Sequence, residues 1–412
     1  MEFIVKELEE AQELLLNQIS EPSFESVNLI ESAGRIAAQD IFAGINVPSF
    51  RRSPLDGYAL RSEDTRGANP KSPVFIKVID EVRAGDTREG LSLPCGSAVK
   101  IMTGAPMPLN ADTVIKKEDV RVIDPSTIEV AMQLFPGLNV IEEGADIRAS
   151  EKIVSAGEQL TPYHIGALAA GGIAEVQVYK VPRIAVISSG EEVRSPGQPL
   201  SYGQIYNSNL YALVALINGL GAEGYGLGCV TDKEEDIAQA IQDALAGYDL
   251  VITTGGVSVG DYDLMLKAIQ NIKASVLFSR IKMKPGTPTT AAVKDGKLII
   301  CLSGNPAAAL IGFELLVKKL IKKMRRETST SLPVIIGKLL DGFDKKSPQR
   351  RFLRVKLAYE EKTGWAARQT GSQDSSVLKS MIGCNALVDI PAGSGTIAPG
   401  ADVKILPLFE LP

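Results

Sequence analysis

The clearest pattern in this 412-residue chain is an alternation of short apolar runs with longer amphipathic runs between residues 183 and 326. The apolar runs predict buried strands at 183–187, 224–230 and 249–254, and the amphipathic runs predict helices at 206–219, 233–246 and 263–272. An Asp295-Gly296 hairpin and a helix from about Ala307 to Met324 complete the segment. Strands and helices in this order predict a doubly wound α/β domain.

Polar, glycine-bearing loops follow three of the predicted strands. They read Ser188-Ser189-Gly190-Glu191-Glu192, then Thr254-Gly255-Gly256, then Ser303-Gly304-Asn305-Pro306. Because the carboxyl ends of parallel strands open on one edge of a sheet, we expect the loops to meet there. Strand, glycine turn and helix start together aim backbone N–H groups at an anion. One such loop is also common as a plain connection, so the interpretation depends on all three together, with Lys282 and Lys284 between them.

Outside this segment the pattern predicts smaller domains. Amphipathic helices are expected at 3–19 and about 26–41, short β runs at about 73–130, and further β runs after 331. The predicted fold is multidomain α/β plus β, with an extended helical N-terminal domain, an inserted small β domain, the α/β domain and a C-terminal β-barrel-like domain. We place their boundaries at 1–46 with 139–180, 47–138, 181–327 and 328–412.

Composition narrows the function. A net charge of −5 argues against a nucleic-acid surface. No stretch is long and apolar enough to span a bilayer, and Met1-Glu2-Phe3 lacks the start of a signal peptide, so we expect a cytoplasmic protein without a membrane role. Cys95, Cys229, Cys301 and Cys384 form no Cys-x-x-Cys pair, which gives no zinc signature and favours mostly buried free thiols.

The chain has a single histidine, His164. It lies in the apolar run Pro-Tyr-His-Ile-Gly-Ala-Leu, which predicts a small helix and a structural role. Histidine-based acid/base catalysis and histidine-ligated transition metals are therefore disfavoured. The chemistry that remains uses carboxylates, hydroxyls, Lys, Arg, backbone groups and hard cations such as Mg²⁺.

Two further motifs do not support a function. Gly256-Val-Ser258-Val-Gly260 matches a nucleophile elbow, but that fold needs a histidine after the serine, and the only histidine precedes it. Gly224-Tyr-Gly-Leu-Gly228 resembles part of a dinucleotide fingerprint but lies within a predicted strand. The loop carboxylates are Asp56, Asp146, Glu192, Asp232 and Asp263. Taken singly, such residues are more often turn or cap residues, and Asp232 is placed to cap the helix that begins at Lys233.

Taken together, the motifs resemble the molybdopterin molybdenumtransferase family, which includes the E domain of gephyrin. In chain order they are Ser-Pro-Leu-Asp56-Gly-Tyr-Ala, Met-Thr103-Gly-Ala-Pro, Gly144-Ala-Asp146-Ile, Ser-Ser-Gly-Glu-Glu192, Gly203-Gln-Ile-Tyr-Asn-Ser-Asn, Thr-Gly-Gly-Val-Ser-Val-Gly-Asp-Tyr-Asp263, Lys284-Pro-Gly and Gly304-Asn-Pro306. They run in the family's order over nearly the whole chain, so the resemblance is specific.

The resemblance implies a four-domain architecture and a homodimer whose cleft is shared between subunits. It implies a transferase of molybdenum cofactor biosynthesis that takes molybdate and adenylylated molybdopterin, with Mg²⁺, to molybdenum cofactor and AMP. Small-molecule substrates are expected, and the molybdopterin adenylyltransferase and molybdoenzyme chaperones are candidate protein partners. A phosphoanhydride and an oxyanion need N–H nests, cations and Mg²⁺-holding carboxylates, which agrees with the residue types found above.

The resemblance also implies roles for individual residues. The expected catalytic residues are Asp56, Thr103, Asp146, Glu192 and Asp263, with Asp56 and Thr103 entering from the partner subunit. The expected molybdopterin and phosphate site comprises Ser189, Gly190, Asn207, Asn209, Gly255, Gly256, Ser258, Ser303, Gly304 and Asn305. Oxyanion and charge contacts are expected from Arg280, Lys282, Lys284, Arg350 and Arg351, and Mg²⁺ ligands from Glu192, Asp232 and Asp263.

Three positions depart from the family pattern. Thr287 replaces the second lysine of Lys-Pro-Gly-Lys-Pro, Ser303 replaces the first proline of Pro-Gly-Asn-Pro-Val-Ser, and Ala308 replaces its serine. We associate these stretches with the oxyanion end of the site, where Arg350, Arg351 and Arg354 are candidates to restore charge. Two alternatives therefore stay open: a paralogue that binds molybdopterin nucleotide without inserting metal or that prefers tungstate, and a dimeric scaffold.

Overall fold

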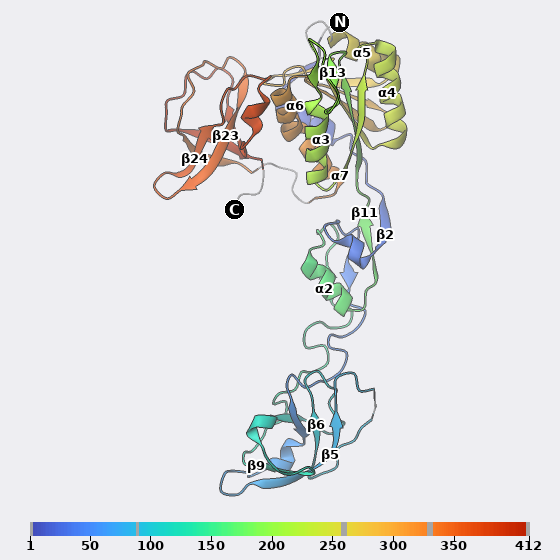
Figure 1. The fold of residues 1–412 in the computed structure, drawn as a ribbon, viewed down its shortest axis with the longest axis vertical. Coiled ribbons are helices and arrows are strands. Elements are labelled where there is room, and N and C mark those ends of the chain that lie inside the picture. Colours follow the sequence, from blue (N-terminus) through green and yellow to red (C-terminus); the bar gives the residue numbers. More distant parts are fainter. Residues whose placement is uncertain (1–2, 88–89, 257–261, 328–332, 409–412) are drawn as a thin grey trace. The chain divides into compact units, whose positions relative to one another are not determined.

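The computed structural model describes residues 3–87, 90–256, 262–327 and 333–408, with the side chains of residues 262 and 263 excepted (Figure 1). The chain forms two compact units. The first unit comprises Met1–Glu25, Gly34–Ile36 and Tyr179–Pro412, and the second comprises Ser26–Ala33 and Ala37–Val178.

A six-stranded sheet organises the first unit. Its strands are β12 (Arg183–Ser189), β15 (Glu223–Val230), β16 (Leu250–Thr254), β17 (Ser275–Phe278), β20 (Thr290–Lys294) and β21 (Lys297–Leu302), in the spatial order β15-β12-β16-β21-β20-β17. The four strands from β15 to β21 are parallel, whereas β20 and β17 pair antiparallel. The carboxyl ends of β12, β16 and β21 therefore lie at one edge, as predicted from the three loops.

Helices cover both faces of this sheet (Figure 1). They are α3 (Ser208–Gly219), α4 (Glu234–Gly247), α5 (Tyr262–Asn271) and α6 (Pro306–Gly312), the last continuing through the π-helical segment η4 (Phe313–Val317) into α7 (Lys318–Met324). In β16, Leu250 and Ile252 pack with α3, α6 and α7, while Val251 packs with α4 and α5. Alternate residues of a strand point to opposite faces, so a wholly apolar strand needs cover on both sides. The doubly wound prediction is confirmed.

The individual predictions for this segment agree closely with the observed elements. Asp295 and Gly296 both adopt positive φ in the β20–β21 hairpin, at 51° and 76°. Pro306 occupies the first turn of α6, where its missing N–H does not break a helical hydrogen bond. The long helix to Met324 is also confirmed, with one π-helical turn inside it.

The C-terminal residues form a closed barrel of five strands. These are β22 (Ile335–Leu339), β23 (Arg350–Glu360), β24 (Gly364–Gln369), β25 (Ala386–Ile390) and β26 (Ala401–Pro407), and the β23–β25 pairing closes the ring. The short strand β19 (Met283–Lys284) pairs with β23. Phe352, Leu387 and Leu408 share a core with the α/β helices, so the barrel packs directly on that domain.

The second unit contains its own six-stranded sheet with the order β7-β4-β6-β5-β9-β8. Its strands are β4 (Gly57–Leu60), β5 (Val74–Val82), β6 (Ser97–Ile101), β7 (Thr113–Lys116), β8 (Arg121–Asp124) and β9 (Thr127–Val130). Tyr58, Ile76 and Ile128 contribute to its core. The predicted inserted β domain is present, but the four sets of domain boundaries remain a prediction, because the chain separates into two units rather than four.

The prediction of a helix at about 26–41 is wrong. Residues Phe24–Asn28 form strand β2 with alternating exposure, and Leu29–Ser32 form a single 3-10 turn. Gly34 then adopts a φ of +78°, which ends any helical continuation. The remaining short elements near the inserted domain are β3 (Ile41–Phe42), β10 (Lys152–Val154), α2 (Pro162–Ala170) and β11 (Glu175–Tyr179).

The helix expected at 3–19 is shorter than predicted. Helix α1 spans Leu8–Leu16 and buries Leu8, Ala11 and Leu15, which recur at the spacing of an amphipathic helix. Residues Val5–Lys6 instead form strand β1, which pairs in parallel with β18 (Arg280–Ile281). Backbone pairing with a distant strand, which no local pattern reveals, overrides the amphipathic signal at this end.

Other sequence predictions have mixed outcomes. His164 lies in α2, where it takes part in the cap with Thr161. Cys301 and Cys384 are buried as predicted, whereas Cys95 and Cys229 are exposed, so the expectation of mostly buried thiols is wrong for two of the four. Among the described residues, no helix combines the length and apolar character required to cross a membrane.

Candidate functional site

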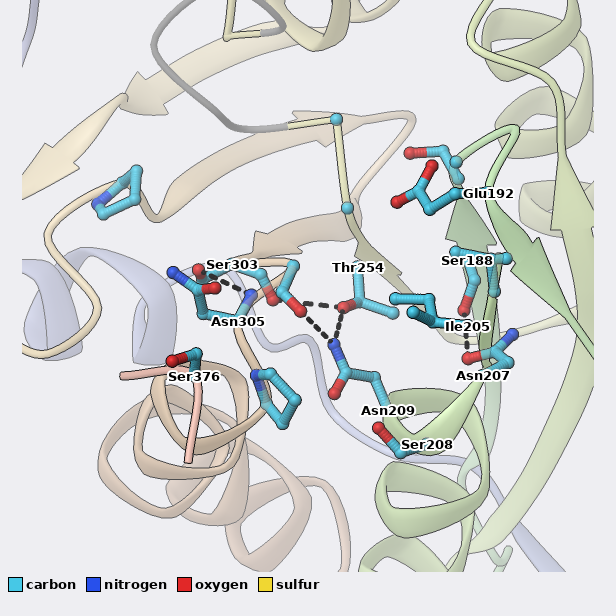
Figure 2. A pocket seen from close by; sticks show the side chains of 18 of the residues that line it. Ser188, Glu192, Ile205, Asn207, Ser208, Asn209, Thr254, Ser303, Asn305 and Ser376 are labelled. Atoms are coloured by element: carbon cyan, nitrogen blue, oxygen red, sulfur yellow. Dashed lines mark hydrogen bonds between the residues drawn. The ribbon is translucent and has the colours of Figure 1, made fainter. Parts of the chain in front are cut away.

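A cavity of about 760 Å³ opens where β12, β16 and β21 end (Figure 2). All three predicted loops line it, together with the start of α3. The loops approach so closely that a Cβ on Gly255 would lie 2.3 Å from the carbonyl oxygen of Ser189. A Cβ on Gly304 would lie 3.3 Å from the Cα of Gly255. Glycine is therefore required at Gly255, whose φ of +98° also disfavours a side chain.

Hydrogen bonds tie the loops after β16 and β21 to helix α3. The Asn209 amide nitrogen donates to Thr254 Oγ1 at 2.7 Å and to the Gly304 carbonyl at 2.9 Å, as Figure 2 shows. Thr254 Oγ1 in turn donates to the Ser303 carbonyl at 3.1 Å. The predicted role of Asn209 as a ligand contact stays a prediction; its observed contacts connect α3 to the β16 and β21 loops.

Helix α3 points its N-terminus at this cavity. Asn207 is its N-cap, accepting from the Leu210 N–H at 3.2 Å and from Ser188 Oγ at 3.1 Å. Ser208 and Asn209, in the first turn, line the cavity. Unpaired N–H groups and the helix dipole make such a terminus favourable for an anion.

Two carboxylates, Glu192 and Asp232, line the same cavity. Although Cys229 is exposed as a residue, partial desolvation of its sulfur raises the pKa of the thiol, and the negative charges of Asp232 and Glu192 raise this pKa further. Both carboxylates therefore lie close enough to act on the same thiol. The N-cap position of α4 is Lys233 rather than Asp232, and the Asp232 carboxylate accepts from the Glu191 N–H at 3.2 Å.

Oxygen ligands of this kind suit Mg²⁺, so Glu192 and Asp232 fit the expected cation. Within the described residues no group of three or more His, Cys, Asp or Glu side chains is assembled for a metal. The side chain of Asp263, the third predicted ligand, lies outside the part of the chain that the structure describes. The whole of Ser258 also lies outside it.

The lysine and arginine side chains expected to contact the oxyanion do not all lie at the cavity. Arg280 lines the cavity, and its guanidinium also stacks on Phe3. Lys282 is bound to Glu7 at 2.7 Å, and Lys284 is exposed on β19, so neither lines the cavity.

The two barrel arginines also lie away from the cavity lining. Arg350 bonds to Asp389 at 2.8 Å and to Glu9 at 2.7 Å, and the bond to Asp389 raises its pKa. Arg351 stacks on Phe343 of the barrel. Their observed partners are structural, and a direct oxyanion contact would require them to leave those partners.

The three departures from the family pattern have different surroundings. Thr287 lines the cavity and donates to the Met283 carbonyl at 2.5 Å. Ser303 also lines it, and its Oγ accepts from the Asn305 N–H at 3.2 Å. Ala308 is buried in α6 and is absent from the lining, so a serine at this position would not face the cavity directly.

Sequence reasoning missed a contribution from the C-terminal barrel. Ser376 lines the cavity, and the Oγ of its neighbour Ser375 accepts from the Asn305 amide at 3.2 Å. These serines belong to the predicted C-terminal β domain, which is separate from the α/β domain in sequence. Only the packing of the barrel on α6 brings them to the cavity. The dipeptide Ser375-Ser376, in a loop with Gly371 and Gln373, was the available signal.

The second unit holds another cluster of predicted residues. Asp56 accepts from the Thr103 N–H at 2.9 Å and from Thr103 Oγ1 at 2.8 Å, and Lys117 Nζ lies 3.2 Å away. These contacts, led by the backbone N–H, lower the pKa of Asp56 from 3.8 to about 2. Asp146 lies apart in a loop, where its N–H donates to the Val47 carbonyl at 3.0 Å. The structure thus pairs Asp56, a half-buried and ionised carboxylate, with Thr103.

Comparison with known families accounts for most of the chain. Residues 6–172 match the MoeA N-terminal region (domains I and II), and residues 185–323 match a family described as a probable molybdopterin binding domain. Residues 337–408 match the MoeA C-terminal region (domain IV).

Individual relatives agree with these matches. Molybdopterin molybdenumtransferase from Staphylococcus aureus is 35% identical over 402 residues, covering 97% of this chain and 94% of that protein. The enzyme of the same name from Staphylococcus epidermidis is 34% identical over 400 residues, with the same coverage.

Solved structures of molybdopterin biosynthesis MoeA proteins from Pyrococcus horikoshii are similar over their whole length. One has a TM-score of 0.86 at 35% identity, with 99% of this chain and 100% of that chain covered. A second has a TM-score of 0.76 at 29% identity, with 98% and 100% covered.

Proposed function

This chain belongs to the MoeA family, and from that premise we propose that it is a molybdopterin molybdenumtransferase. It transfers molybdenum from molybdate to adenylylated molybdopterin and releases AMP. The observation that carries the proposal is the convergence of three serine- and glycine-bearing loops with Glu192 and Asp232 around one cavity. We further propose a cytoplasmic homodimer in which Asp56 and Thr103 act in the cleft of the partner subunit.

The cavity suits a phosphorylated substrate. N–H groups at the start of α3, hydroxyls of the three loops and the Arg280 guanidinium supply donors to phosphate oxygens. Because the hydrogen bonds among Asn209, Thr254 and Ser303 fix the loops after β16 and β21 against α3, the donors on these elements need little reorganisation when charge develops on the phosphoanhydride. The chain's own residues thus bind and orient the phosphates.

Glu192 and Asp232 are the residues that would hold Mg²⁺ in this cavity. When bound, the cation neutralises negative charge on phosphate or molybdate oxygens. Without a cation the two carboxylates would repel an anionic substrate, so the acidic pair favours a site that works with a divalent metal. Asp263, expected as a further ligand or catalytic group, remains a prediction.

The reaction test measures AMP release from adenylylated molybdopterin with Mg²⁺, in parallel with molybdate, tungstate and no oxyanion. Molybdate-dependent release that is lost when Mg²⁺ is omitted supports the proposal. Tungstate-dependent release alone assigns a different oxyanion. Tight nucleotide binding without release under all three conditions contradicts it and indicates the non-inserting paralogue.

The paralogue alternative rests on Thr287 and Ser303, which line the cavity in place of the family's lysine and proline. A Thr287→Lys variant distinguishes the transferase from the non-inserting paralogue. If the native threonine weakens oxyanion binding, the lysine should lower the molybdate concentration needed for half-maximal AMP release; no change means that Arg280 and the loop donors suffice.

A further inference from the structure

Arg354 is a fully buried arginine in β23 of the C-terminal barrel. Its Nη2 donates to the carbonyl oxygens of Ser372 at 2.9 Å and Asp374 at 3.1 Å. Its backbone is tied to the same stretch, because its N–H donates to Gln373 Oε1 at 2.8 Å and its carbonyl accepts from Thr370 Oγ1 at 3.1 Å. Arg354 thus fixes residues 370–376, named here the 370–376 segment, from one side.

The other side of the 370–376 segment lies on the cavity. The Ser375 carbonyl accepts from the Ala307 N–H at 3.0 Å, in the first turn of α6. Ser375 Oγ accepts from the Asn305 amide at 3.2 Å, and Ser376 lines the cavity wall (Figure 2). The segment therefore links Arg354 to the loop after β21.

Burying an arginine in this part of the barrel carries a large free-energy cost of desolvation. Burying a guanidinium costs far more than burying a methionine of comparable length, unless its donors are used to hold specific acceptors. Here burial lowers the pKa of Arg354. Its Nη2 donates to two carbonyls of the 370–376 segment, whereas its Nε and Nη1 have no hydrogen-bond partner among the described residues. A side chain selected for packing alone would not need this geometry.

We propose that Arg354 is a positioning residue of the cavity: it holds the 370–376 segment, and through it Ser375 and Ser376, against the loop after β21. The C-terminal barrel thereby sets one wall of the substrate site without Arg354 itself reaching the substrate. The effect of Arg354 on substrate KM rests on the proposed function, whereas its effect on the position of the 370–376 segment does not.

The structural test is amide hydrogen exchange at single-residue resolution in Arg354→Met. The Ala307 N–H is bonded to Ser375, whereas the Ala309 N–H is bonded to Asn305 within the helix. We expect exchange at Ala307 to accelerate on the order of tenfold while Ala309 is unchanged. Arg354→Lys, which keeps a donor, should restore part of the protection, and Arg368→Met on the exposed barrel surface is the matched control. Equal acceleration at both amides, or none at either, overturns the proposal.

The kinetic test compares the same variants in AMP release. We expect Arg354→Met to raise KM for adenylylated molybdopterin about tenfold with kcat within about twofold, and Arg354→Lys to recover part of the loss. An unchanged KM contradicts the proposal. If Arg354→Met does not fold, Gln373→Leu loosens the segment from the half-buried side and is judged by both readouts in the same way. If the unsubstituted protein releases no AMP, the proposed function fails, while the exchange result still decides the role of Arg354.

Discussion

Single residues in the second unit carry a measurable electrostatic signature. Asp56 is half-buried, and its pKa is lowered to about 2 by the Thr103 N–H, then by Thr103 Oγ1 and Lys117. A carboxyl whose folded pKa lies below the ordinary 3.8 contributes stability above that value and loses it as pH falls toward about 2. At neutral pH Asp56 is therefore a permanent negative charge, suited to contacting a cation or positioning a donor rather than to transferring protons.

We predict that Thr103→Ala raises the pKa of Asp56 part of the way from about 2 to 3.8, because the hydroxyl is lost but the backbone donor remains. Carbon NMR titration of the Asp56 carboxyl measures this. Lys117→Met, which removes both a hydrogen bond and a positive charge, should also raise the pKa of Asp56. An Asp56 that titrates identically in Thr103→Ala would show that the hydroxyl does not stabilise the carboxylate.

At the scale of elements, the site depends on how closely three strand-ending loops approach. Gly255 combines a φ of +98° with a backbone contact that leaves no room for a Cβ. Gly296, in the β20–β21 hairpin, has a φ of +76° but open space around its Cα. Substitutions at the two glycines therefore distinguish the cost of backbone strain alone from the combined cost of strain and a steric clash.

We predict that Gly255→Ala lowers the free energy of unfolding of the first unit by about 2–4 kcal/mol, since strain and clash add, whereas Gly296→Ala costs about 1 kcal/mol from strain alone. Denaturant unfolding of both variants gives the comparison. Equal losses would mean that the loops can separate without penalty and that the observed approach does not constrain Gly255.

At the scale of the whole molecule, a buried lysine that is paired with a glutamate of its own helix also bonds to the backbone at the end of the barrel within the first unit. Lys318 Nζ lies 2.9 Å from Glu314, with side chains 9% and 4% exposed, and Lys318 also donates to the Leu408 carbonyl. Burial raises the pKa of Glu314 despite the attraction of Lys318. The pair therefore holds the end of β26 against the long helix, next to the core that both domains share.

We predict that Lys318→Met destabilises the first unit by about 3–5 kcal/mol at neutral pH, because Glu314 is left as a buried, unpaired charge. With a raised pKa, the folded state binds the Glu314 proton more tightly than the unfolded state, so the loss should shrink as pH falls toward 5. Thermal unfolding at two pH values measures it. Glu314→Leu combined with Lys318→Met should recover most of the stability; a double variant as weak as the single one would refute the account.

The sequence by itself determined the elements whose patterns are local. Strands with a continuous apolar run, such as Leu250–Ile252 in β16, require burial on both faces. Asp295-Gly296 and Asn305-Pro306 dictate a hairpin and a helix start through their own backbone preferences. Those preferences, and the order of the motifs, were enough to predict the doubly wound domain and the edge where three loops meet. The same local logic failed at 26–41, where Gly34 interrupts an amphipathic pattern.

Only the tertiary structure decided which charged and polar side chains share the cavity. Arg350 and Lys282 turn toward Asp389 and Glu7, whereas Ser376, far along the chain, reaches the wall. These outcomes depend on long-range packing of the barrel against α6 and on ion pairs between distant segments. A sequence records which residues are available, but the partner that each charge finds is set by the free energy of the assembled fold.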